Sequence, residues 1–396
     1  MDLQFSEAEQ TFVAQVRAFL DAEAAHPDVA DFMNTRREAD SQLADSPARR
    51  AFNQRLAAKG YLGMSWPVEY GGKALPGIYE YLLNEELSSR GAPLIGKGVG
   101  CVGKTIIRHG SDRLKREFLP KILGAEIEFA LGYTEPSSGS DLASLRLRAT
   151  RDGDYWVLSG QKTFTTSAHF ADWYWVAART DPNLPKHKGI SLFLVPMNHP
   201  GLTVHAIETV GGHRTNQVFF DDVRVHRDYL VGEENRGWVY ICEALDYERF
   251  TLYTIKPLSN KFAALVDSIK AARRDDKPLA ADDKVRRTLA HLAGEVELAK
   301  MLQRRVVAAA AKGGVPAVEA AMFKLYSTQL GQRLADAAME LLGPESLLAH
   351  GVEGAPDDGR WEHSYRATLV DTIGGGSSEI QKNIIARRGL GLPYEN

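Results

Sequence analysis

The rest of the chain is organised around the stretch Gly132-Tyr133-Thr134-Glu135-Pro136-Ser137-Ser138-Gly139-Ser140-Asp141, called the first segment below. It lies between a part of the chain with helical patterning and a part with strand patterning. Its glycines, hydroxyls and small side chains leave N–H groups and Oγ atoms free to point outward, which suits a flat, acceptor-rich or anionic ligand. An ordinary Ser/Gly loop has the same composition, so the meaning of the segment depends on its surroundings.

Length and composition set the class of protein. At 396 residues, 44% hydrophobic and 25% charged, the chain has room for two or three globular domains. A formal net charge of −3 gives no reason to expect nucleic acid or an anionic membrane as a partner. The acidic N-terminus lacks the pattern of a secretory signal peptide, and no uncharged apolar run approaches a membrane span. Cys101 and Cys242 match no metal spacing and make no disulfide framework, so we expect no metal and a cytoplasmic protein.

Residues 1–125 are patterned as helices. Ser6-Glu7-Ala8-Glu9 predicts a capping box with Ser6 as N-cap. The apolar residues that follow recur at helical spacing: Phe12, Val16, Phe19 and Leu20.

The hydrophobic period changes to two from Phe129 onward, which is typical of strands. Residues 145–149 alternate, Asp152-Gly153 is a hairpin turn signal, and residues 155–158 form the expected return strand. Further strands are expected at residues 173–178, 190–195, 202–207 and 217–225. The pattern predicts a compact antiparallel β-domain over residues 126–235.

Helical patterning returns after Gly237 and continues through the C-terminal part of the chain, residues 236–396. One face of a long helix is traced by Leu292, Val296, Ala299, Leu302 and Val306. A second capping box is expected at residues 378–381, opening a last helix that Gly389, Gly391 and Pro393 end. The whole predicts a multidomain α+β fold: an N-terminal α-helical domain (1–125), a central antiparallel β-domain (126–235) and a C-terminal α-helical bundle (236–396).

The first segment resembles the flavin-binding loop of the acyl-CoA dehydrogenase family, through the order Thr-Glu-Pro-x-x-Gly-Ser-Asp placed just after residues 118–123. The helix–sheet–helix order is also the architecture of that family, so the resemblance covers nearly the whole chain. It implies FAD as cofactor, with contacts on Tyr133, Thr134, Gly139 and Ser140. Thr134 would bond the ring edge and Ser140 the pyrophosphate. Glu135 would be a structural part of the loop.

A second segment, Gly160-Gln161-Lys162-Thr163-Phe164-Thr165-Thr166-Ser167, resembles the second flavin loop of the family. In that loop an aromatic side chain packs on the isoalloxazine and a Thr bonds near its reactive nitrogen, and these positions fall on Phe164 and Thr166. Many members have Trp where this chain has Phe164, and either ring offers a stacking face. The structural alternative is a strand-end aromatic in the core beside a solvated Thr.

The resemblance implies α,β-desaturation of an acyl-CoA thioester, in which a carboxylate takes the α-proton while the β-hydride passes to flavin N5. Many members carry this base in a Glu-Gly-Thr/Ser motif near the C-terminus. The corresponding run here is Gly374-Gly375-Gly376-Ser377, and glycine cannot take a proton. A minority carries the base on an early helix of the C-terminal domain, just before an Arg. Glu248 is therefore the predicted base, with Asp246 as the fallback.

Arg249 would be a structural or CoA-side partner of that base, although a solvated Glu–Arg pair on a helix is the alternative. Gly375 removes a side chain from the substrate pocket, which would admit a branched or bulky acyl group. The glycine run before a helix N-terminus also suits an anionic group, which adds Ser377 and Glu379 to the flavin contacts. A flexible hinge is the alternative there.

Residues 272–279 are the counterpart of an Arg-x-x-Phe-Gly element that reaches the flavin of a neighbouring subunit in the family. Asp275-Asp276 replaces the Phe-Gly and the Arg is displaced to Arg273, while residues 342–345 depart from a glycine-pair pattern with the same role. Some bacterial relatives, notably those acting on steroid side chains, are mixed assemblies of two dehydrogenase-like chains with incomplete flavin sites. We therefore expect a homo-oligomer (dimer or tetramer) or a heterotetramer, with an electron-transfer flavoprotein as acceptor. A non-redox partner subunit stays open, as does a relative with other flavin chemistry, such as a thioester desulfinase or nitroalkane oxidase.

Overall fold

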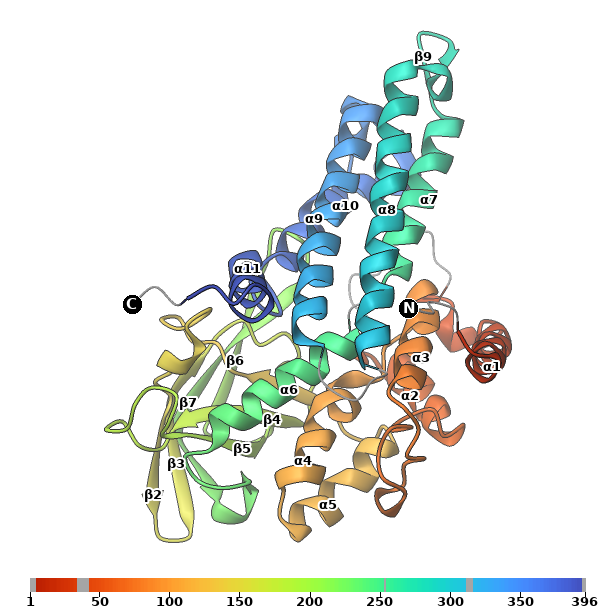
Figure 1. Cartoon of the computed structure of the whole chain (residues 1–396). Coiled ribbons are helices and arrows are strands. Elements are labelled where there is room, and N and C mark those ends of the chain that lie inside the picture. Colours follow the sequence, from red (N-terminus) through yellow and green to blue (C-terminus); the bar gives the residue numbers. More distant parts are fainter. Residues whose placement is uncertain (1–4, 34–42, 253, 311–315, 394–396) are drawn as a thin grey trace.

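The computed structural model describes residues 5–33, 43–252, 254–310 and 316–393, and of residues 246–252 and 310 it describes the backbone alone. An N-terminal group of helices and a β-domain lie side by side, and a bundle of long C-terminal helices rises from them (Figure 1). The predicted fold class, α+β with helical N- and C-terminal parts around a sheet, is confirmed. The boundaries at residues 125 and 235 stay a prediction. In the described part of the chain, no helix is both long and apolar enough to cross a membrane.

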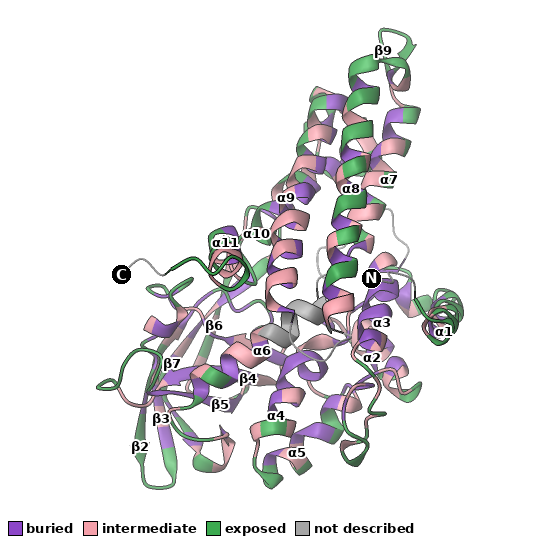
Figure 2. Cartoon of the chain, in the orientation of Figure 1, coloured by how far each residue is buried: buried purple, intermediate pink, exposed green. Residues whose placement is uncertain are grey.

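The N-terminal helices are α1 (Glu7–Glu23), α2 (Pro47–Ala58), α3 (Ile78–Ser89), α4 (Gly103–His109) and α5 (Asp112–Leu123), with a π-helical turn, η3 (Gly98–Val102), before α4. The predicted capping box of α1 is confirmed, because Ser6 Oγ accepts from Glu9 N at 3.3 Å and Glu9 Oε2 accepts from Ser6 N at 2.7 Å. Three of the four expected apolar positions on this face, those of Phe12, Val16 and Leu20, are buried. Helix α3 is buried along most of its length and forms the centre of this part (Figure 2).

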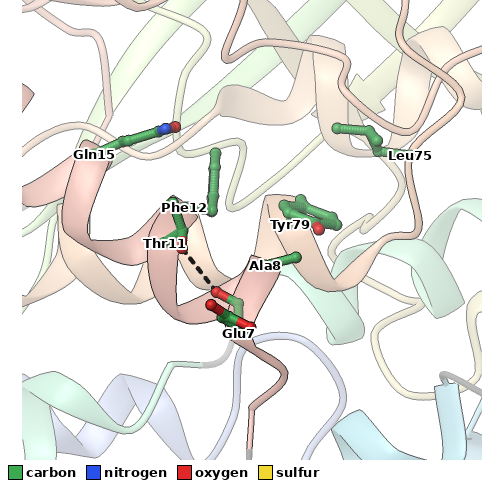
Figure 3. A pocket seen from close by; sticks show the side chains of 7 residues that line it. All are labelled: Glu7, Ala8, Thr11, Phe12, Gln15, Leu75 and Tyr79. Carbon is green, nitrogen blue, oxygen red and sulfur yellow. Dashed lines mark hydrogen bonds between the residues drawn. The ribbon is translucent and has the colours of Figure 1, made fainter.

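A surface pocket of about 530 Å³ opens between α1 and α3 (Figure 3). It is lined by Glu7, Ala8, Thr11, Phe12, Gln15, Leu75 and Tyr79. Thr11 Oγ1 donates to the Glu7 carbonyl at 2.8 Å, within the same helix. This pocket belongs to the outer N-terminal helices, on the opposite side of the molecule from the β-domain (Figure 1), and neither predicted segment lines it.

The β-domain is one sheet with the strand order β6-β7-β3-β2-β4-β5-β8, and β1 pairs with β4. The strands are β1 (Phe129–Gly132), β2 (Arg148–Asp152), β3 (Tyr155–Lys162), β4 (Trp173–Arg179), β5 (Ile190–Pro196), β6 (Leu202–Glu208), β7 (Arg214–His226) and β8 (Leu230–Val231). Most pairs are antiparallel as predicted, but β4 lies parallel to both β1 and β2. Both parallel partners reach β4 through long connections, which is what a parallel neighbour requires.

Two details of the predicted hairpin change. Its first strand begins at Arg148, so residues 145–147 precede the ladder. Asp152 pairs with Tyr155, so the two-residue turn is Gly153-Asp154 rather than Asp152-Gly153. Gly153 has φ +60°, which a residue without Cβ adopts at low cost.

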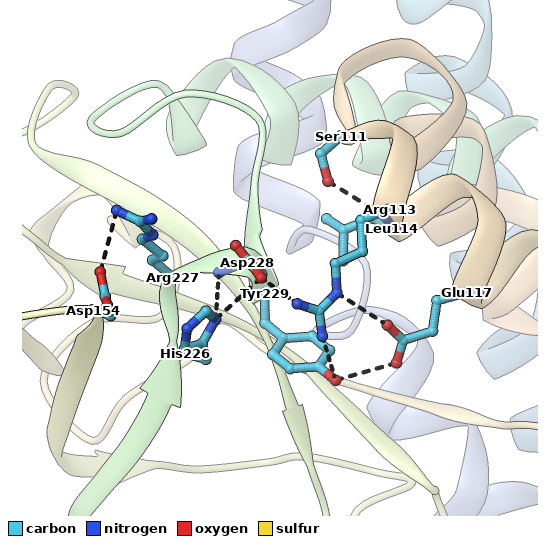
Figure 4. Close-up of polar contacts among 9 residues, drawn as sticks. All are labelled: Ser111, Arg113, Leu114, Glu117, Asp154, His226, Arg227, Asp228 and Tyr229. Atoms are coloured by element: carbon cyan, nitrogen blue, oxygen red, sulfur yellow. Dashed lines mark hydrogen bonds and ion pairs between the residues drawn. The ribbon is translucent and has the colours of Figure 1, made fainter.

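The N-terminal helices are joined to the β-domain by a polar cluster between α5 and the turn after β7 (Figure 4). Arg113 of α5 forms an ion pair with Asp228, and its guanidinium lies 5.1 Å from the centre of the Tyr229 ring. Tyr229 donates to Glu117 Oε1 of α5 at 3.2 Å. Cation–π and charged hydrogen bonds thus hold α5 against the sheet.

The C-terminal helices are α6 (Gly237–Leu252), α7 (Lys256–Ala271), α8 (Asp283–Ala310), α9 (Ala317–Leu342), α10 (Arg360–Asp371) and α11 (Ser378–Ile384). Helix α6 crosses between the β-domain and α4, while α7 to α10 form the bundle (Figure 1). The expected face of α8 is confirmed, since Leu292, Val296, Ala299 and Val306 are buried. At the tip of the bundle β9 (Arg273–Arg274) and β10 (Lys277–Pro278) form a hairpin.

The second predicted capping box is wrong. The N-cap of α11 is Ser377, whose Oγ accepts from Ile380 N at 3.4 Å, so Ser378 is already the first helical residue. Gln381 does not reach back to cap the helix. Its Nε2 turns inward and donates to the carbonyls of Gly375 (3.3 Å) and Gly376 (3.0 Å). The side-chain amide of Gln381 thus bonds to carbonyls of the preceding glycine run and not to the N-cap backbone.

Candidate active site

The first segment is held from within by Glu135, which is 5% exposed. Its Oε2 accepts from Arg146 N at 2.6 Å, and its Oε1 accepts from Leu147 N at 2.8 Å and from Lys162 Nζ at 2.8 Å. Both carboxylate oxygens thus accept hydrogen bonds that hold the first segment against residues 146–147 and Lys162. The geometry is consistent with the expectation that Glu135 is part of the loop and not the base.

Lys162 links the first segment to the second. Its side chain is fully buried, and its Nζ donates to the Tyr133 carbonyl at 3.1 Å as well as to Glu135. Burial lowers the pKa of Lys162 to about 8, while the charge and hydrogen bond of Glu135 raise it. A buried ion pair whose partners come from both segments fixes the distance between them.

The backbone of the second segment is pinned on both sides of Phe164. Thr163 N donates to the Thr134 carbonyl at 2.9 Å, and Thr165 N donates to the Asn216 carbonyl at 3.0 Å. Between these anchors Phe164 has φ +55° and a side chain that is 62% exposed. A large apolar ring on the surface, on a backbone conformation that costs about 1–3 kcal/mol, is retained only where the surroundings enforce it, and such residues cluster at ligand sites. The expected exposed ring at Phe164 is therefore present, and the alternative of an aromatic in the core is wrong.

Asn216 of β7 is a residue that the sequence did not point to. It is fully buried, and its Nδ2 donates to the Thr165 carbonyl at 2.8 Å and approaches His169 Nδ1 at 3.1 Å. Its role is to hold the turn of the second segment from the neighbouring strand. Nothing in the local sequence marks it, because an Asn within strand patterning is equally common on a solvated face.

The remaining residues predicted to hold the flavin differ in exposure. Gly139, Ser140 and Thr166 are exposed and Thr134 is half-buried, so these backbone and hydroxyl groups are accessible. Tyr133 is different. Its ring is buried and its hydroxyl accepts from Trp175 Nε1 at 2.8 Å, so this side chain already has a structural partner.

Three of the seven buried polar side-chain atoms that lack a hydrogen-bond partner in the described part of the chain lie in or beside these segments. Ser138 Oγ in the first segment, Thr215 Oγ1 beside Asn216 and Gln381 Oε1 beside the glycine run are buried and unsatisfied among the described residues. A buried polar atom without a partner costs about 1–3 kcal/mol. Each of these atoms belongs to or adjoins a segment expected to contact the flavin, so a polar ligand bound there could supply the missing hydrogen bonds.

The glycine run is held by the C-terminal helices. Lys324 Nζ of α9 donates to the Gly376 carbonyl at 2.7 Å, and Ser378 N donates to the Thr372 carbonyl at 3.0 Å. Gly375 and Gly376 have φ +66° and +91°, values that favour glycine. Ser377 Oγ caps α11. A hydrogen bond from the backbone of Glu379 lowers the pKa of the exposed Glu379 carboxyl, and a hydrogen bond from Ser377 adds to this shift. The described contacts thus tie Ser377 and Glu379 to α9–α11 and not to the two β-domain segments.

The predicted base lies in α6, but the side chains of Glu248, Arg249 and Asp246 are outside the described residues. The first half of the helix is described. Glu243 Oε2 contacts His109 Nε2 of α4 at 2.8 Å, and the rings of His109 and Tyr240 lie 4.4 Å apart. Ile241 and Ala244 of α6 are buried.

A second polar cluster lies behind the second segment, and the sequence did not indicate it either. Lys97 Nζ donates to Ser167 Oγ at 2.7 Å, and Arg50 pairs with Asp172 at 3.0 Å. Burial raises the pKa of Glu128 to about 7, and Asp172 adds to the shift while Arg50 and Lys97 oppose it. The cluster joins α2 and the N-cap of η3 to the residues that precede β4, and it contacts the second segment through Ser167.

A basic pocket of about 690 Å³ adjoins the C-terminal end of the first segment. Its charged lining consists of Arg146, Arg148, Arg151, Arg179, Lys186 and Glu234. Arg179 holds the pocket wall by donating to the backbone carbonyls of Ala143 (2.6 Å) and Lys188 (2.8 Å). In the described part of the chain the guanidinium groups of Arg146 and Arg148 have no ion-pair partner, so both are available to an anionic ligand.

Comparison with known proteins gives a consistent result. Models described as acyl-CoA dehydrogenase N-terminal, middle and C-terminal domain match residues 6–126, 130–223 and 235–390. Acyl-CoA dehydrogenase FadE29 of Mycobacterium tuberculosis is 38% identical over 357 residues, covering 88% of this chain and 89% of that protein. Among solved structures, the "Tcur3481-Tcur3483 steroid ACAD" has a TM-score of 0.88 at 33% identity, over 100% of both chains. The ChsE4-ChsE5 complex from M. tuberculosis has a TM-score of 0.88 at 30% identity, also over 100% of both chains.

Proposed function

The chain belongs to the acyl-CoA dehydrogenase family and is an acyl-CoA dehydrogenase of flavoprotein type, and from this premise we propose that it desaturates an acyl-CoA thioester between the α and β carbons with FAD as its flavin. The observation that carries the proposal is the exposed ring of Phe164, held at positive φ between two pinned backbone positions. A surface aromatic kept in a costly conformation is accounted for by a flat ring system packed on it.

The residues present fit a flavin. Phe164 offers a stacking face, Thr134 and Thr166 offer hydroxyls at the ring edge, and Gly139 and Ser140 offer an exposed N–H and hydroxyl for a pyrophosphate. An added Cβ at Gly139 would meet nothing within 4 Å, so the backbone there is open to close approach. We place Tyr133 in the site through its backbone, because its hydroxyl is bonded to Trp175. Ser377 and Glu379 would add contacts from the C-terminal helices.

The proposed base is Glu248. It follows Ile241 by seven positions and Ala244 by four, the spacing that repeats one face of a helix, and both of those residues are buried. A base that abstracts an α-proton at neutral pH needs a desolvated site that raises its pKa. Asp246, two positions before Glu248, falls on another face. A bound flavin supplies the acceptor for the hydride equivalent that leaves the β carbon.

We further propose that the basic pocket takes the phosphates of CoA. Arg146, Arg148 and Arg151 present guanidinium groups beside the first segment, and bidentate Arg–phosphate pairs are a common mode of phosphate recognition. Arg249 would be a structural or CoA-side partner of the base. Replacing both Arg146 and Arg148 by Gln should raise KM for an acyl-CoA and leave the KM for the matching acyl-pantetheine unchanged. An equal effect on both thioesters would remove the pocket from the proposal.

The acyl group that we propose is branched or bulky. Gly375 stands where many members of the family have a carboxylate side chain. The absence of a side chain at this position would leave more room in the substrate pocket. One similar solved structure carries the words "steroid ACAD" in its title, which agrees with this choice. A substrate panel that favours short, straight acyl chains would contradict it.

The partners that we propose are an electron-transfer flavoprotein as acceptor and at least one further dehydrogenase-like chain. Helix α10 supports the second, because Tyr365 and Leu369 lie four positions apart on it and are 47% and 44% exposed, and Ile373 in the turn after the helix is 68% exposed. An apolar stripe of this kind on a described surface is typical of an interface. Light scattering on the purified chain, alone and with a co-expressed relative, distinguishes a homo-oligomer from a heterotetramer.

The experiment that tests the function is the visible spectrum of the purified protein before and after anaerobic addition of acyl-CoA thioesters. A yellow protein that one thioester bleaches supports the proposal, and that thioester identifies the acyl class. A protein that stays colourless with added FAD would favour a non-redox partner subunit instead.

The base is tested separately by Glu248→Gln, which should keep bound flavin and lose turnover. Glu243→Gln on the same helix is the matched control, because Gln still accepts from His109 and turnover should persist. Full turnover in Glu248→Gln would favour a relative with other flavin chemistry.

A further inference from the structure

The junction between α6 and α7 is held by a carboxylate from a distant helix. Glu85 of α3 is 5% exposed, and its Oε1 accepts from Ile255 N at 2.8 Å while its Oε2 accepts from Lys256 N at 3.0 Å. Ile255 is the N-cap position of α7 and has no side-chain cap of its own. Glu85 therefore caps α7 from another domain and places a negative charge at its N-terminus, where the helix dipole stabilises it.

The same carboxylate collects contacts from two further elements. Tyr81 of α3 donates its hydroxyl to Glu85 Oε1, and Gln303 Nε2 of α8 donates to Oε1 at 3.3 Å. Burial raises the pKa of Glu85, and the hydrogen bonds from Tyr81, Ile255 and Lys256 oppose the shift. One carboxylate thus ties α3, α7 and α8 together at a single point.

Neighbouring residues of α3 hold the same junction. Ser88 Oγ lies 2.6 Å from Thr254 Oγ1, and Asn260 Nδ2 donates to the Ser89 carbonyl at 2.9 Å. The C-terminal turn of α3 therefore contacts the chain where it leaves α6 and enters α7. Apart from Ser259 Oγ of α7 itself, which donates to the Ile255 carbonyl at 3.2 Å, the described side-chain hydrogen bonds to Thr254 and Ile255 come from α3.

The position of this junction matters for α6. Its first half is fixed by contacts of Glu243 and Tyr240 with His109 of α4, whereas Glu248 lies in the second half. Glu248 precedes the end of the helix, Leu252, by about 6 Å along the axis at 1.5 Å per residue. Ile255, which is bonded to Glu85, follows Leu252 by only three positions. A displacement of Ile255 is therefore expected to move the end of the helix that carries Glu248.

We propose that Glu85 is a positioning residue for the dehydrogenation, which sets the end of α6 that carries Glu248 by capping α7 from helix α3. The inference rests on the proposed function, because it takes Glu248 as the base. Glu85 touches no reacting atom. It acts through the α6–α7 junction, and a misplacement of about 1 Å at a reacting group can lower a rate by 10²-fold.

The variants follow from the atoms. Glu85→Ala removes every contact, whereas Glu85→Gln can keep its oxygen at the Oε1 position, where it still accepts from Tyr81 and Ile255 and loses only the bond to Lys256 N. Ser88→Ala removes the contact to Thr254 and leaves the fold of α3 intact. Glu80→Ala is the matched control. Glu80 is a fully buried carboxylate on the same helix, but it bonds to Ser65 and Lys104 and not to α6 or α7.

Two measurements test the proposal on the flavin-loaded enzyme. Hydrogen exchange in peptides covering residues 243–260 should be faster in Glu85→Ala than in the wild type or Glu80→Ala. The single-turnover rate of flavin reduction, measured with the acyl-CoA that bleaches the flavin in the thioester panel, should fall 10- to 100-fold in Glu85→Ala. The change in KM should be smaller, and the isotope effect with α-deuterated substrate should increase. Ser88→Ala should show a smaller loss, and Glu85→Gln should recover most of the rate.

The outcomes separate the inference from the function beneath it. If Glu248→Gln is inactive but Glu85→Ala reduces its flavin at the rate of Glu80→Ala, the inference is overturned and the proposed function stands. If Glu85→Ala does not fold, Ser88→Ala decides, and wild-type exchange and rate in that variant would overturn the inference. Full turnover in Glu248→Gln would remove the proposed base and the inference together.

Discussion

Lys162→Met is expected to remove one partner of the buried ion pair that joins the two flavin segments. The carboxylate of Glu135 would keep its bonds from Arg146 N and Leu147 N but lose the ammonium at 2.8 Å, and the Tyr133 carbonyl would lose a donor at 3.1 Å. Breaking a buried pair on one side costs about 3–5 kcal/mol. Because burial already lowers the pKa of Lys162 to about 8, its charge is held at some cost, and we expect the lower end of that range.

The matched control is the ion pair of Lys186 and Asp141 at the end of the same segment. Its N–O distance, 2.9 Å, is nearly the same, but the side chains are 52% and 58% exposed. Exposed pairs of this kind contribute about 0.2–1 kcal/mol, so Lys186→Met should change the stability by less than 1 kcal/mol. Burial of the pair and the additional bond of Lys162 to the Tyr133 carbonyl account for the expected difference between the two variants.

The assay is urea unfolding followed by tryptophan fluorescence, with the flavin content of each purified variant measured in parallel. Trp175 donates to Tyr133 in the first segment, so its emission reports on this region. A cycle of Lys162→Met, Glu135→Gln and the double variant should give a coupling of at least about 1 kcal/mol. If Lys162→Met costs no more than Lys186→Met, or if it keeps a full complement of flavin, the two segments do not depend on this pair.

Three further outcomes are expected. The folded-state pKa of Glu128, about 7, lies above its ordinary value of 4.5, so this group adds stability below pH 4.5 that is lost as the pH rises through 7. In denaturant titrations the stability of Glu128→Gln relative to wild type should therefore increase between pH 5 and 8. A difference that stays constant with pH would contradict this. Gly375→Ala should lower the free energy of unfolding by about 1–2 kcal/mol, because Gly375 has φ +66°. Gly374→Ala, whose added Cβ would lie 3.5 Å from the nearest atom, should leave the thermal stability nearly unchanged. Equal losses in the two variants would show that backbone strain is not the cause. Phe164→Ala should lower flavin affinity at least 10-fold in a titration followed by flavin fluorescence, while Tyr155→Ala, an exposed aromatic on β3, should leave it unchanged.

The features that the sequence predicted correctly are those in which residues close together in the chain determine the local structure. The capping box of α1 depends on residues three positions apart, and β6 and much of β7 follow an alternation of more and less exposed side chains that would favour a strand in any sheet. Ser377 shows the limit of this reasoning. Two adjacent serines precede α11, and which of them caps the helix was decided by the glycine run that captures Gln381.

The chain order of helices, sheet and helices was thus determined by the sequence alone, as was the identity of the two segments that resemble flavin loops. The tertiary structure decided which distant residues support them. Lys162 meets Glu135 across 27 positions, Asn216 meets Thr165 across 51, and Glu85 meets Ile255 across 170. A carboxylate or amide has the same local pattern whether it is solvated or buried. Only the packing of remote elements decides which of them loses its water and must find a partner inside the protein.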